Sequence, residues 1–223
     1  MGSVVQLASS PVEEVLPVVE HALVTLAGAA VFPTDTVYGI GQAVSANPDG
    51  PGLLFSIKRR PLGKVVPWLV GSASDVARYC TDVPSYVPAL VEAFWPGGLT
   101  LVLRASSEVP PAYRAADGTV ALRNPRSDFL LALIDRIGSP LATTSANTSG
   151  LPAPLSFAEV EPRIVEEATV TVDGGRAGGD RASTVLVCLP DAPRVSRAGT
   201  VSERAVCDLL GLETLAGLPP EGK

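Results

Sequence analysis

The sequence is poor in several residue types on which many enzymes and small stabilised domains depend. Its 223 residues include one histidine, His21, one methionine and three cysteines, Cys80, Cys188 and Cys207. A single histidine argues against a Ser-His-Asp or Cys-His enzyme and against most zinc sites. The cysteines are odd in number, far apart and in no C-x-x-C spacing, so neither a zinc knuckle nor a redox pair is indicated. We therefore expect reduced thiols in a cytoplasmic protein.

Charge and long apolar runs are also scarce. Charged residues make up 18% of the chain and the net charge is −6. This argues against a general nucleic-acid binder, because such affinity comes from cations that neutralise phosphates. The apolar runs fall short of the roughly 18 residues that a membrane span needs. The N-terminus carries Glu13 and Glu14 without a basic segment, so we expect neither a signal peptide nor a membrane partner.

Glycine and proline, in contrast, are abundant, with 21 of each, and hydrophobic residues make up 46% of the chain. This composition is typical of a turn-rich folded chain, not of a disordered one. A chain of this length buries enough surface to fold without a disulfide or a structural metal. Because neither a repeat nor a Ser/Gly linker divides it, we expect one domain over residues 1–223, with a frayed tail over residues 212–223.

Apolar periodicity and turn residues predict a mixture of helices and strands. A first helix is predicted from Ser10 as N-cap to Gly28, although Pro17 leaves open a start near that residue. Other helices are predicted from Asp49-Gly50-Pro51 onward and over residues 84–94, 128–137 and 202–210. Strands are predicted over residues 29–32, 65–70, 99–103, 119–123, 170–172 and 184–189. Strands and helices mix without strict alternation, which favours an α/β domain with a mixed sheet.

Two groups of polar residues near the N-terminus could carry chemistry. Pro33-Thr34-Asp35-Thr36-Val37-Tyr38-Gly39 follows a predicted strand, where open α/β sheets bind ligands. Lys58-Arg59-Arg60-Pro61-Leu62-Gly63-Lys64 places four cations within seven residues and could hold a polyphosphate. A polar turn and a solvated helix end remain the respective alternatives.

Two further groups lie in the second half of the chain. The segment Thr143-Thr144-Ser145-Ala146-Asn147-Thr148-Ser149-Gly150 has six hydroxyl or amide side chains in eight residues. It could bind a nucleotide or could be a turn-rich loop. Arg123 ends an apolar strand, so its cation needs an anion from the protein or from a ligand. Arg197 is a second isolated arginine. The sequence has no G-x-x-x-x-G-K-[ST] motif, so an ATP site here is not a P-loop.

These groups, in this order, resemble the motifs of the YrdC family, the threonylcarbamoyl-adenylate synthases of tRNA modification. The resemblance covers a core of about residues 12–211. It implies the single-domain form of the family, with a twisted, open, mixed α/β sheet, flanking helices and a concave basic pocket. The matching pieces are Pro33-Thr34-Asp35-Thr36-Val37-Tyr38-Gly39-Ile40-Gly41, Lys58-x-Arg60, Trp95-Pro96-Gly97-x-Leu99-Thr100, Val120-x-x-Arg123-x-Pro125, Ser145-Ala146-Asn147-x-Ser149-Gly150 and Ser183-Thr184-Val185.

The resemblance implies a nucleotidyltransferase that joins L-threonine, bicarbonate and ATP into threonylcarbamoyl-AMP and releases pyrophosphate, for the t6A modification of tRNA. Mg²⁺ is expected with the triphosphate, with no metal site of the protein's own. The product would pass to a tRNA threonylcarbamoyl transferase, and direct tRNA binding would be weak or absent. The alternatives are a carbamoyl-adenylate-forming enzyme on the same fold and a double-stranded RNA or tRNA binder.

The resemblance also assigns roles to individual residues, with Lys58 and Arg60 as the catalytic pair and Asp35 and Tyr38 as supporting residues. The implied threonine site consists of Thr36, Arg123, Thr143 and Ser183. The implied nucleotide site consists of Lys58, Arg60, Lys64, Thr119, Ser145, Asn147 and Arg197.

The chain departs from the family pattern at several positions. Arg59 stands where the family often has glycine, and Val65 and Gly98 stand where proline is common. Ala153 replaces a serine that often helps to bind ATP, and Ala198 replaces the proline of Leu-Arg-Pro-Gly. The main cations and the Ser-Ala-Asn core are retained, but the departures leave open a paralogue with a changed acyl acceptor.

Overall fold

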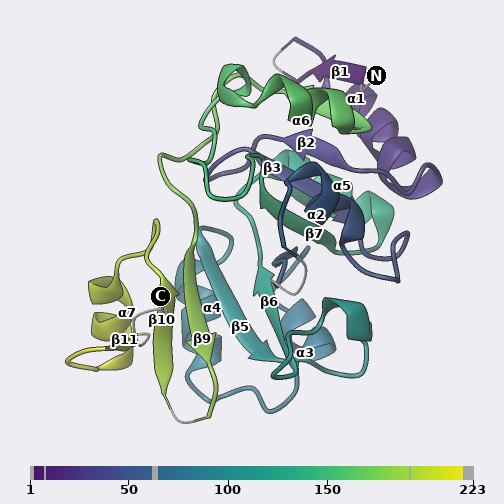
Figure 1. Ribbon diagram of the computed structural model, residues 1–223. Helices are drawn as coiled ribbons and strands as arrows, with labels where there is room; N and C mark the ends of the chain where they lie inside the picture. The colour runs from purple at the N-terminus through teal and green to yellow at the C-terminus, as the bar shows by residue number, and fades with distance from the viewer. Residues whose placement is uncertain (1–2, 8, 62–64, 191, 218–223) are drawn as a thin grey trace.

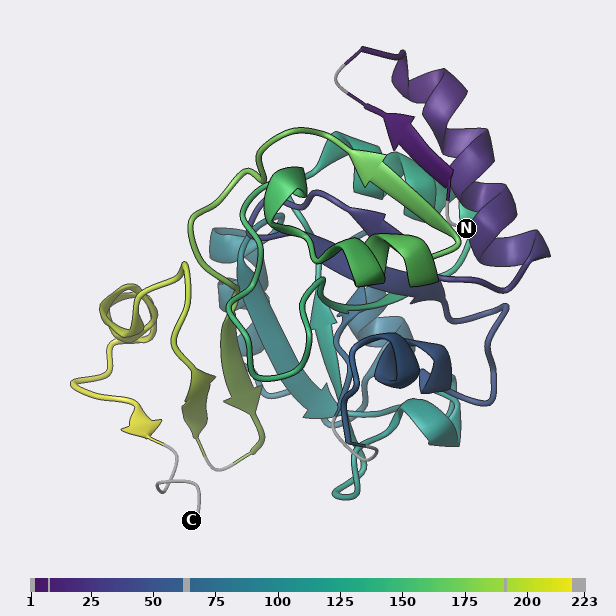
Figure 2. The ribbon, with the colours of Figure 1, turned by 45° about the horizontal axis from the view of Figure 1, so that its top comes forward.

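The computed structural model describes residues 3–7, 9–61, 65–190 and 192–217. The predicted nucleotide-site residue Lys64 and residues 218–223 of the predicted frayed tail lie outside these ranges. The described strands form one sheet in the order β1-β8-β2-β3-β7-β4-β6-β5-β9-β10-β11 (Figure 1). Figure 2 shows β1 and helix α1 at one end of the molecule, and β10, β11 and helix α7 at the other.

The sheet is mixed, which confirms the predicted fold class. Neighbours β2-β3-β7-β4, β6-β5 and β9-β10 are antiparallel, whereas β1-β8-β2, β4-β6, β5-β9 and β10-β11 are parallel. The strands are β1 (Ser3–Gln6), β2 (Ala30–Phe32), β3 (Gly39–Ala43), β4 (Trp68–Leu69), β5 (Leu99–Arg104), β6 (Thr119–Arg123), β7 (Leu141–Ser145), β8 (Val170–Asp173), β9 (Thr184–Cys188), β10 (Pro193–Arg197) and β11 (Ala216–Gly217).

The two helices with the clearest sequence signals form as predicted. Ser127 and Ser202 cap α5 and α7 by accepting hydrogen bonds from backbone N–H groups, and each helix ends in a left-handed glycine, Gly138 and Gly211. The helical segments are α1 (Val12–Glu20), the π-helix η1 (His21–Thr25), α2 (Gly52–Ile57), α3 (Asp75–Tyr79), α4 (Val87–Phe94), η2 (Pro111–Tyr113), α5 (Asp128–Ile137), η3 (Phe157–Glu159), α6 (Pro162–Glu167) and α7 (Glu203–Leu210).

The first helix differs from its prediction at both ends. Pro11, not Ser10, occupies the N-cap position, and it makes no side-chain capping bond. Pro17 lies inside α1 and does not start it, so the helix runs on without one backbone N–H. From His21 it widens into the π-helix η1, where the Leu26 N–H donates to the His21 carbonyl over 3.1 Å.

Several elements lack a strong sequence signal and are not among the predicted ones: β1, β3, β7, β10, α3 and α6. Strand β3 begins Gly39-Ile40-Gly41, and glycine weakens a strand signal because it offers no side chain to pack. The predicted strand over residues 65–70 is reduced to β4. Past Gly211, Leu215 is buried and β11 pairs with β10, so the predicted fraying does not extend over residues 212–217.

Paired residues on adjacent strands share one face of the sheet, and the two faces pack differently. One face carries side chains such as Val31, Ile40, Trp68 and Leu122, which form a core with α2, α4, α6 and α7. On the opposite face, α1 and α5 pack over one part only. That part, the apolar half, consists of Ala30, Phe32, Ala43, Leu141 and Val170.

Candidate functional site

Beyond the apolar half, the same face continues as a polar half, made of Gly39, Gly41, Thr143, Ser145 and Arg123. Thr143 and Ser145 follow Leu141 along β7, as Gly41 and Gly39 precede Ala43 along β3. A Cβ atom on Gly41 would lie 2.7 Å from Thr143 Oγ1. Glycine at this position therefore makes room for the Thr143 hydroxyl.

Arg123 ends β6 and is only 6% exposed. Its Nε donates to the Gly97 carbonyl at 2.9 Å, its Nη1 to Thr36 Oγ1 at 2.9 Å, and its Nη2 to Asp35 Oδ1 at 2.5 Å. Burial lowers the pKa of Arg123, and the Asp35 carboxylate acts in the opposite direction. The anion required by this cation is therefore Asp35, and three of the five guanidinium N–H groups are engaged.

Thr36 is held in place from behind by a glycine-rich segment. Its backbone N–H donates to Thr34 Oγ1 at 3.0 Å. The Gly178 N–H donates to the Thr34 carbonyl at 2.9 Å, and a Cβ atom on Gly179 would lie 2.8 Å from Thr36 Cα. The close approach of the two backbones requires glycine there and fixes the loop that carries Thr36.

Ser183 and Arg197 form a second polar cluster at the same end of the sheet. Arg197 Nη2 donates to Ser183 Oγ at 3.0 Å and to its carbonyl at 2.9 Å, and Ser183 Oγ lies 2.9 Å from Thr100 Oγ1. A Cβ atom on Gly199 would lie 2.3 Å from the Ala182 carbonyl oxygen. Gly199 therefore lets the chain after β10 approach closely enough for Arg197 to reach Ser183.

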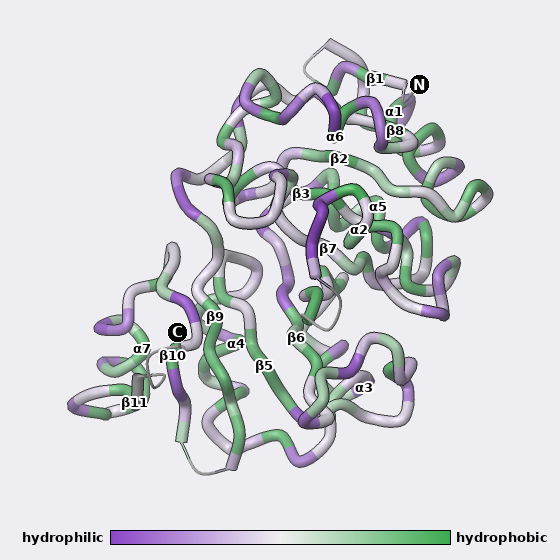
Figure 3. Tube along the Cα trace, in the orientation of Figure 1, coloured by the Kyte–Doolittle hydropathy of each residue, from purple (hydrophilic) through white to green (hydrophobic). Residues whose placement is uncertain are grey.

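Lys58, just after α2, is buried against the loop that follows β7. Its Nζ donates to the Ser145 carbonyl, to the Asn147 carbonyl at 2.6 Å and to Asn147 Oδ1 at 3.1 Å. All three N–H groups of the ammonium are therefore directed at protein oxygens. Burial, and secondarily the charge of Arg60, lowers the pKa of Lys58 to about 8. Figure 3 shows the hydrophilic segment that follows α2 running beside β7.

Arg60 is half-buried near the same strand. Its Nη1 donates to Thr144 Oγ1 at 3.3 Å and its Nη2 to the Val65 carbonyl at 3.1 Å. Among the described residues, its buried Nε has no hydrogen-bond partner. Partial burial and the charges of Arg123 and Arg60 lower the pKa of Arg197, so the three arginines share one electrostatic environment.

The structure explains the departure at Gly98, whereas at Arg59 it shows why glycine would be preferred. Arg59 has φ +50°, the left-handed conformation for which glycine is preferred, and the Arg60 N–H donates back to the Phe55 carbonyl at 2.9 Å, as in a Schellman helix end. A Cβ atom on Gly98 would lie 2.0 Å from Thr200 Oγ1, which itself donates to the Gly98 carbonyl at 3.1 Å. Glycine at 98 therefore leaves room for the Thr200 hydroxyl in this position.

The structure thus brings most of the sequence-predicted site residues to one region, with one at its margin. Thr119 starts β6 and shares a face with Arg123, but four residues of strand place it about 13 Å away. Its Oγ1 donates to Asp117 Oδ1 at 2.7 Å. Gly97 belongs to one of the matching motifs, but the motif does not indicate that its carbonyl binds Arg123. Glu161, whose side chain accepts from the β7 loop, belongs to no motif or polar cluster of the sequence.

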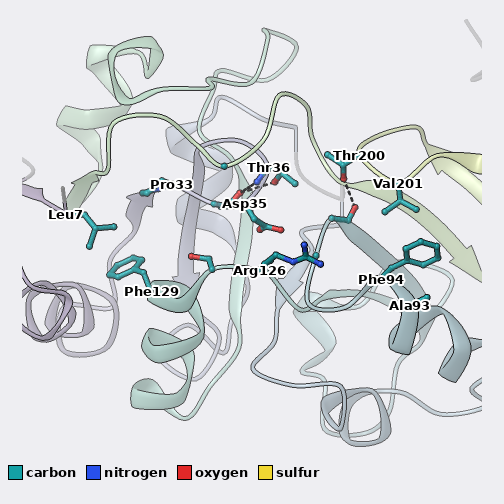
Figure 4. A pocket seen from close by; sticks show the side chains of 15 residues that line it. Leu7, Pro33, Asp35, Thr36, Ala93, Phe94, Arg126, Phe129, Thr200 and Val201 are labelled. Carbon is teal, nitrogen blue, oxygen red and sulfur yellow. Dashed lines mark hydrogen bonds between the residues drawn. The ribbon is translucent and has the colours of Figure 1, made fainter. Parts of the chain in front are cut away.

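A groove of about 580 Å³ borders this region at the end of the sheet. Figure 4 shows Asp35 and Arg126 at its centre, with apolar side chains to either side. Asp35 lines the groove, and its Oδ1 accepts from the buried Arg123. The groove therefore lies beside this ion pair.

The remaining reactive side chains are poor candidates for covalent or metal chemistry. Burial raises the pKa of Cys80 and of Cys188 to about 12, which keeps both as thiols. Within the described ranges, no group of three His, Cys, Asp or Glu residues could hold a metal ion. In the same ranges, no helix is long and apolar enough to cross a membrane. The site offers instead several cations and hydroxyls around an open sheet face, a set suited to anionic substrates.

Comparisons with known proteins agree with this arrangement. The model of the Sua5/YciO/YrdC family, described as "Telomere recombination", matches residues 24–199. The chain is 34% identical over 181 residues to the threonylcarbamoyl-AMP synthase of Bacillus subtilis, which covers 81% of this chain and 52% of that protein. The chain therefore spans about half the length of this relative.

Two further comparisons concern a shorter relative, whose length the match covers about as fully as it covers this chain, and a solved structure. The chain is 34% identical over 183 residues to the putative threonylcarbamoyl-AMP synthase of Mycobacterium tuberculosis H37Rv, covering 82% of this chain and 83% of that protein. The crystal structure of Pyrococcus abyssi Sua5 complexed with L-threonine superposes with a TM-score of 0.88 at 27% identity, over 97% of this chain and 62% of that one.

Proposed function

The chain belongs to the Sua5/YciO/YrdC family, and on that premise we propose that it is an ATP-dependent L-threonylcarbamoyladenylate synthase. The reaction joins L-threonine, bicarbonate and ATP and releases pyrophosphate, and its product serves the t6A modification of tRNA. The observation that carries the proposal is the grouping of three arginines in a chain of net charge −6: Arg60 against β7, Arg123 at the end of β6 and Arg197 at the end of β10, where the first two charges act on the third. Such a local excess of guanidinium groups favours phosphate and carboxylate ligands.

The chemistry needs no covalent nucleophile from the protein. The threonine amine takes up bicarbonate as a carbamate with loss of water, and a carbamate oxygen attacks the α-phosphorus of ATP. The bond from that phosphorus to the bridging oxygen breaks, and pyrophosphate leaves with the electron pair. Catalysis then consists of holding the reactants together and stabilising phosphate charge, which positioned cations and hydroxyls supply.

The nucleotide side of the proposed site is centred on Arg60 and the loop after β7. Arg60 binds the phosphates, and its unpartnered Nε supports this role because a buried donor needs an acceptor. Ser145, Asn147, Thr119, Arg197 and Lys64 belong to the same side of the proposal. Lys58 contributes its positive charge to the nucleotide site and holds the loop in position, since its N–H groups bind loop oxygens.

The threonine side consists of Arg123, Thr36, Thr143 and Ser183. Arg123 retains two N–H groups beyond its three bonds, enough for one carboxylate. In this proposal Asp35, which is bound to the same guanidinium, accepts the threonine ammonium before the carbamate forms. The pair therefore suits a zwitterionic amino acid better than a simple anion.

The proposal extends to the surroundings of the reaction. Mg²⁺ enters on the triphosphate, where phosphate oxygens and water supply its ligands. The product passes to a tRNA threonylcarbamoyl transferase in the cytoplasm. Direct tRNA binding is weak or absent, in line with the negative net charge.

Mass spectrometry of the product tests the proposal. The protein is incubated with ATP, Mg²⁺ and bicarbonate, with threonine varied, and pyrophosphate release is followed in parallel. We expect threonylcarbamoyl-AMP and a saturable dependence on threonine. Pyrophosphate release that is indifferent to threonine but requires carbamoyl phosphate would overturn the proposal in favour of a carbamoyl-adenylate-forming enzyme.

A further inference from the structure

Glu161, at the N-cap position of α6, holds the loop after β7 from behind. The backbone N–H of Thr148 donates to Glu161 Oε1 at 2.6 Å, and Thr148 Oγ1 donates to Glu161 Oε2 at 2.8 Å. Arg163 Nη2 donates to the same hydroxyl at 2.9 Å. Because Arg163 has no acceptor atom, the hydroxyl hydrogen must point to Glu161, and Thr148 is fixed at both its backbone and its side chain.

The opposite side of the same loop is held by the end of α2. Lys58 donates to the carbonyls of Ser145 and Asn147, and the Ser149 N–H donates to the Lys58 carbonyl at 2.9 Å. Arg163 Nη1 joins the two sides, because it also donates to the Ile57 carbonyl at 2.7 Å. Residues 145–149 are thus bound by the Lys58 ammonium on one side and by the Glu161 carboxylate on the other.

The bonds at Glu161 differ from those of an ordinary surface ion pair. Arg163 also forms an ion pair with Glu167 one turn along α6, and exposed pairs of this kind contribute little to stability. Glu161 instead accepts two charge-assisted bonds from one residue of the loop, and the bonds from Thr148 are the main reason that its pKa is lowered. Its negative charge also raises the pKa of Lys58 across the loop, against the effects of burial and of Arg60.

We propose that Glu161 is a positioning residue for nucleotide binding. By fixing Thr148, it keeps the Ser145–Asn147 loop and the Lys58 ammonium in the arrangement that receives ATP. The inference rests on the proposed function, since it assigns the loop to the nucleotide. Glu161 itself makes no contact with the substrates and acts through Thr148 and Lys58.

Glu161→Gln in the full chain tests the proposal, with Glu166→Gln as a control that removes the same charge from an exposed position of α6. Calorimetry with a non-hydrolysable ATP analogue, steady-state kinetics and melting temperature are measured for each. We expect Glu161→Gln to raise the Kd and KM for ATP about tenfold, because a charged acceptor is lost. The KM for threonine should change less than twofold, and Glu166→Gln should match wild type.

Two Thr148 variants keep the test decisive if Glu161→Gln is poorly folded. Thr148→Val removes the hydroxyl that Glu161 and Arg163 share and should weaken ATP binding, whereas Thr148→Ser keeps it and should restore wild-type affinity. Unchanged ATP affinity in both Glu161→Gln and Thr148→Val would overturn the proposal, as would an equal loss of ATP and threonine use. Failure of the proposed function is distinguishable, because the wild-type protein would then form no threonylcarbamoyl-AMP, whereas the comparison of ATP affinities between variants does not depend on the product.

The pH dependence of ATP affinity separates positioning from a merely structural role. The Lys58 ammonium donates three hydrogen bonds, and the neutral amine can donate two, so affinity should fall as pH rises through about 8. Glu161→Gln removes the anion that raises the pKa of Lys58, whereas Arg60, which lowers it, remains. The midpoint of the fall should therefore move to lower pH in the variant. An unmoved midpoint would overturn the proposal.

Discussion

The apolar half and the polar half of one sheet face share strands and register but differ in what fills them. In the apolar half, Phe32 and Leu141 meet side chains of α1 and α5. In the polar half, β3 and β7 present Gly41 and Thr143, and β6 adds Arg123. The change occurs within a single strand, two residues apart.

The difference shows how one fold can separate stability from chemistry. Side chains of the apolar half gain free energy by leaving water and by packing against two helices. Those of the polar half are held by specific hydrogen bonds to loops, such as the bond of Arg123 to the Gly97 carbonyl. Changes in the first half should therefore reduce stability, and changes in the second should reduce substrate use.

The largest effect should come from the apolar half. Leu130 of α5 is fully buried, and Leu130→Ala should lower the free energy of unfolding by about 2 to 5 kcal/mol through lost packing and a cavity. Chemical denaturation measures this loss. The kcat/KM per folded molecule should stay close to the wild-type value. A fall in this kcat/KM would contradict the separation of stability from chemistry between the two halves.

Arg60→Ala should have the next largest effect, on substrate binding. Loss of charge-assisted hydrogen bonds to phosphate should weaken ATP binding by about 1.5 to 3 kcal/mol. Arg59→Ala is the matched control, because Arg59 is the adjacent residue and is exposed. Calorimetry that gave the same ATP affinity for Arg60→Ala and wild type would remove Arg60 from the nucleotide site.

Arg123→Lys should sharpen the comparison within the polar half. A lysine cannot reproduce the planar fork that binds Gly97, Thr36 and Asp35 together, so use of threonine should fall about tenfold or more. Affinity for the ATP analogue, measured without threonine, should change little. Equal losses for the two substrates would show instead that Arg123 supports the whole site.

The smallest effect should be a gain in stability. Arg59→Gly relieves the left-handed backbone of Arg59 at the end of α2, and we expect about 1 kcal/mol of stabilisation. The melting temperature measures the gain, and ATP affinity should not change. A lower melting temperature would show that the long side chain of Arg59 compensates for its backbone.

Local signals explain which parts of the fold could be predicted. Helices α5 and α7 have a serine cap and a glycine end in their own sequence, so their bounds follow from a few residues. Strand β3 exists because β2 and β7 pair with it on both sides, and this information is not local. Ser10 shows the converse, a correct capping residue that the chain does not use.

The sequence motifs predict which residues lie together better than they predict how these residues bond. The sequence motifs gather Lys58, Ser145 and Asn147 as neighbours, and the structure places them in contact. The sequence does not tell that all three Lys58 N–H groups are taken by loop oxygens, because two of these acceptors are backbone carbonyls. Backbone groups have no sequence signature. The ion pair between Asp35 and Arg123 depends on how the strands assemble, so the sequence alone does not reveal it.

The contact between Gly98 and Thr200 constrains the evolutionary paths open to this chain. A proline at 98 would bring a Cβ atom 2.0 Å from the Thr200 hydroxyl oxygen. The two positions are 102 residues apart in sequence, yet a side chain at 98 requires the Thr200 side chain to turn away or to be replaced. Substitutions at the two positions should therefore be non-additive in their effect on stability.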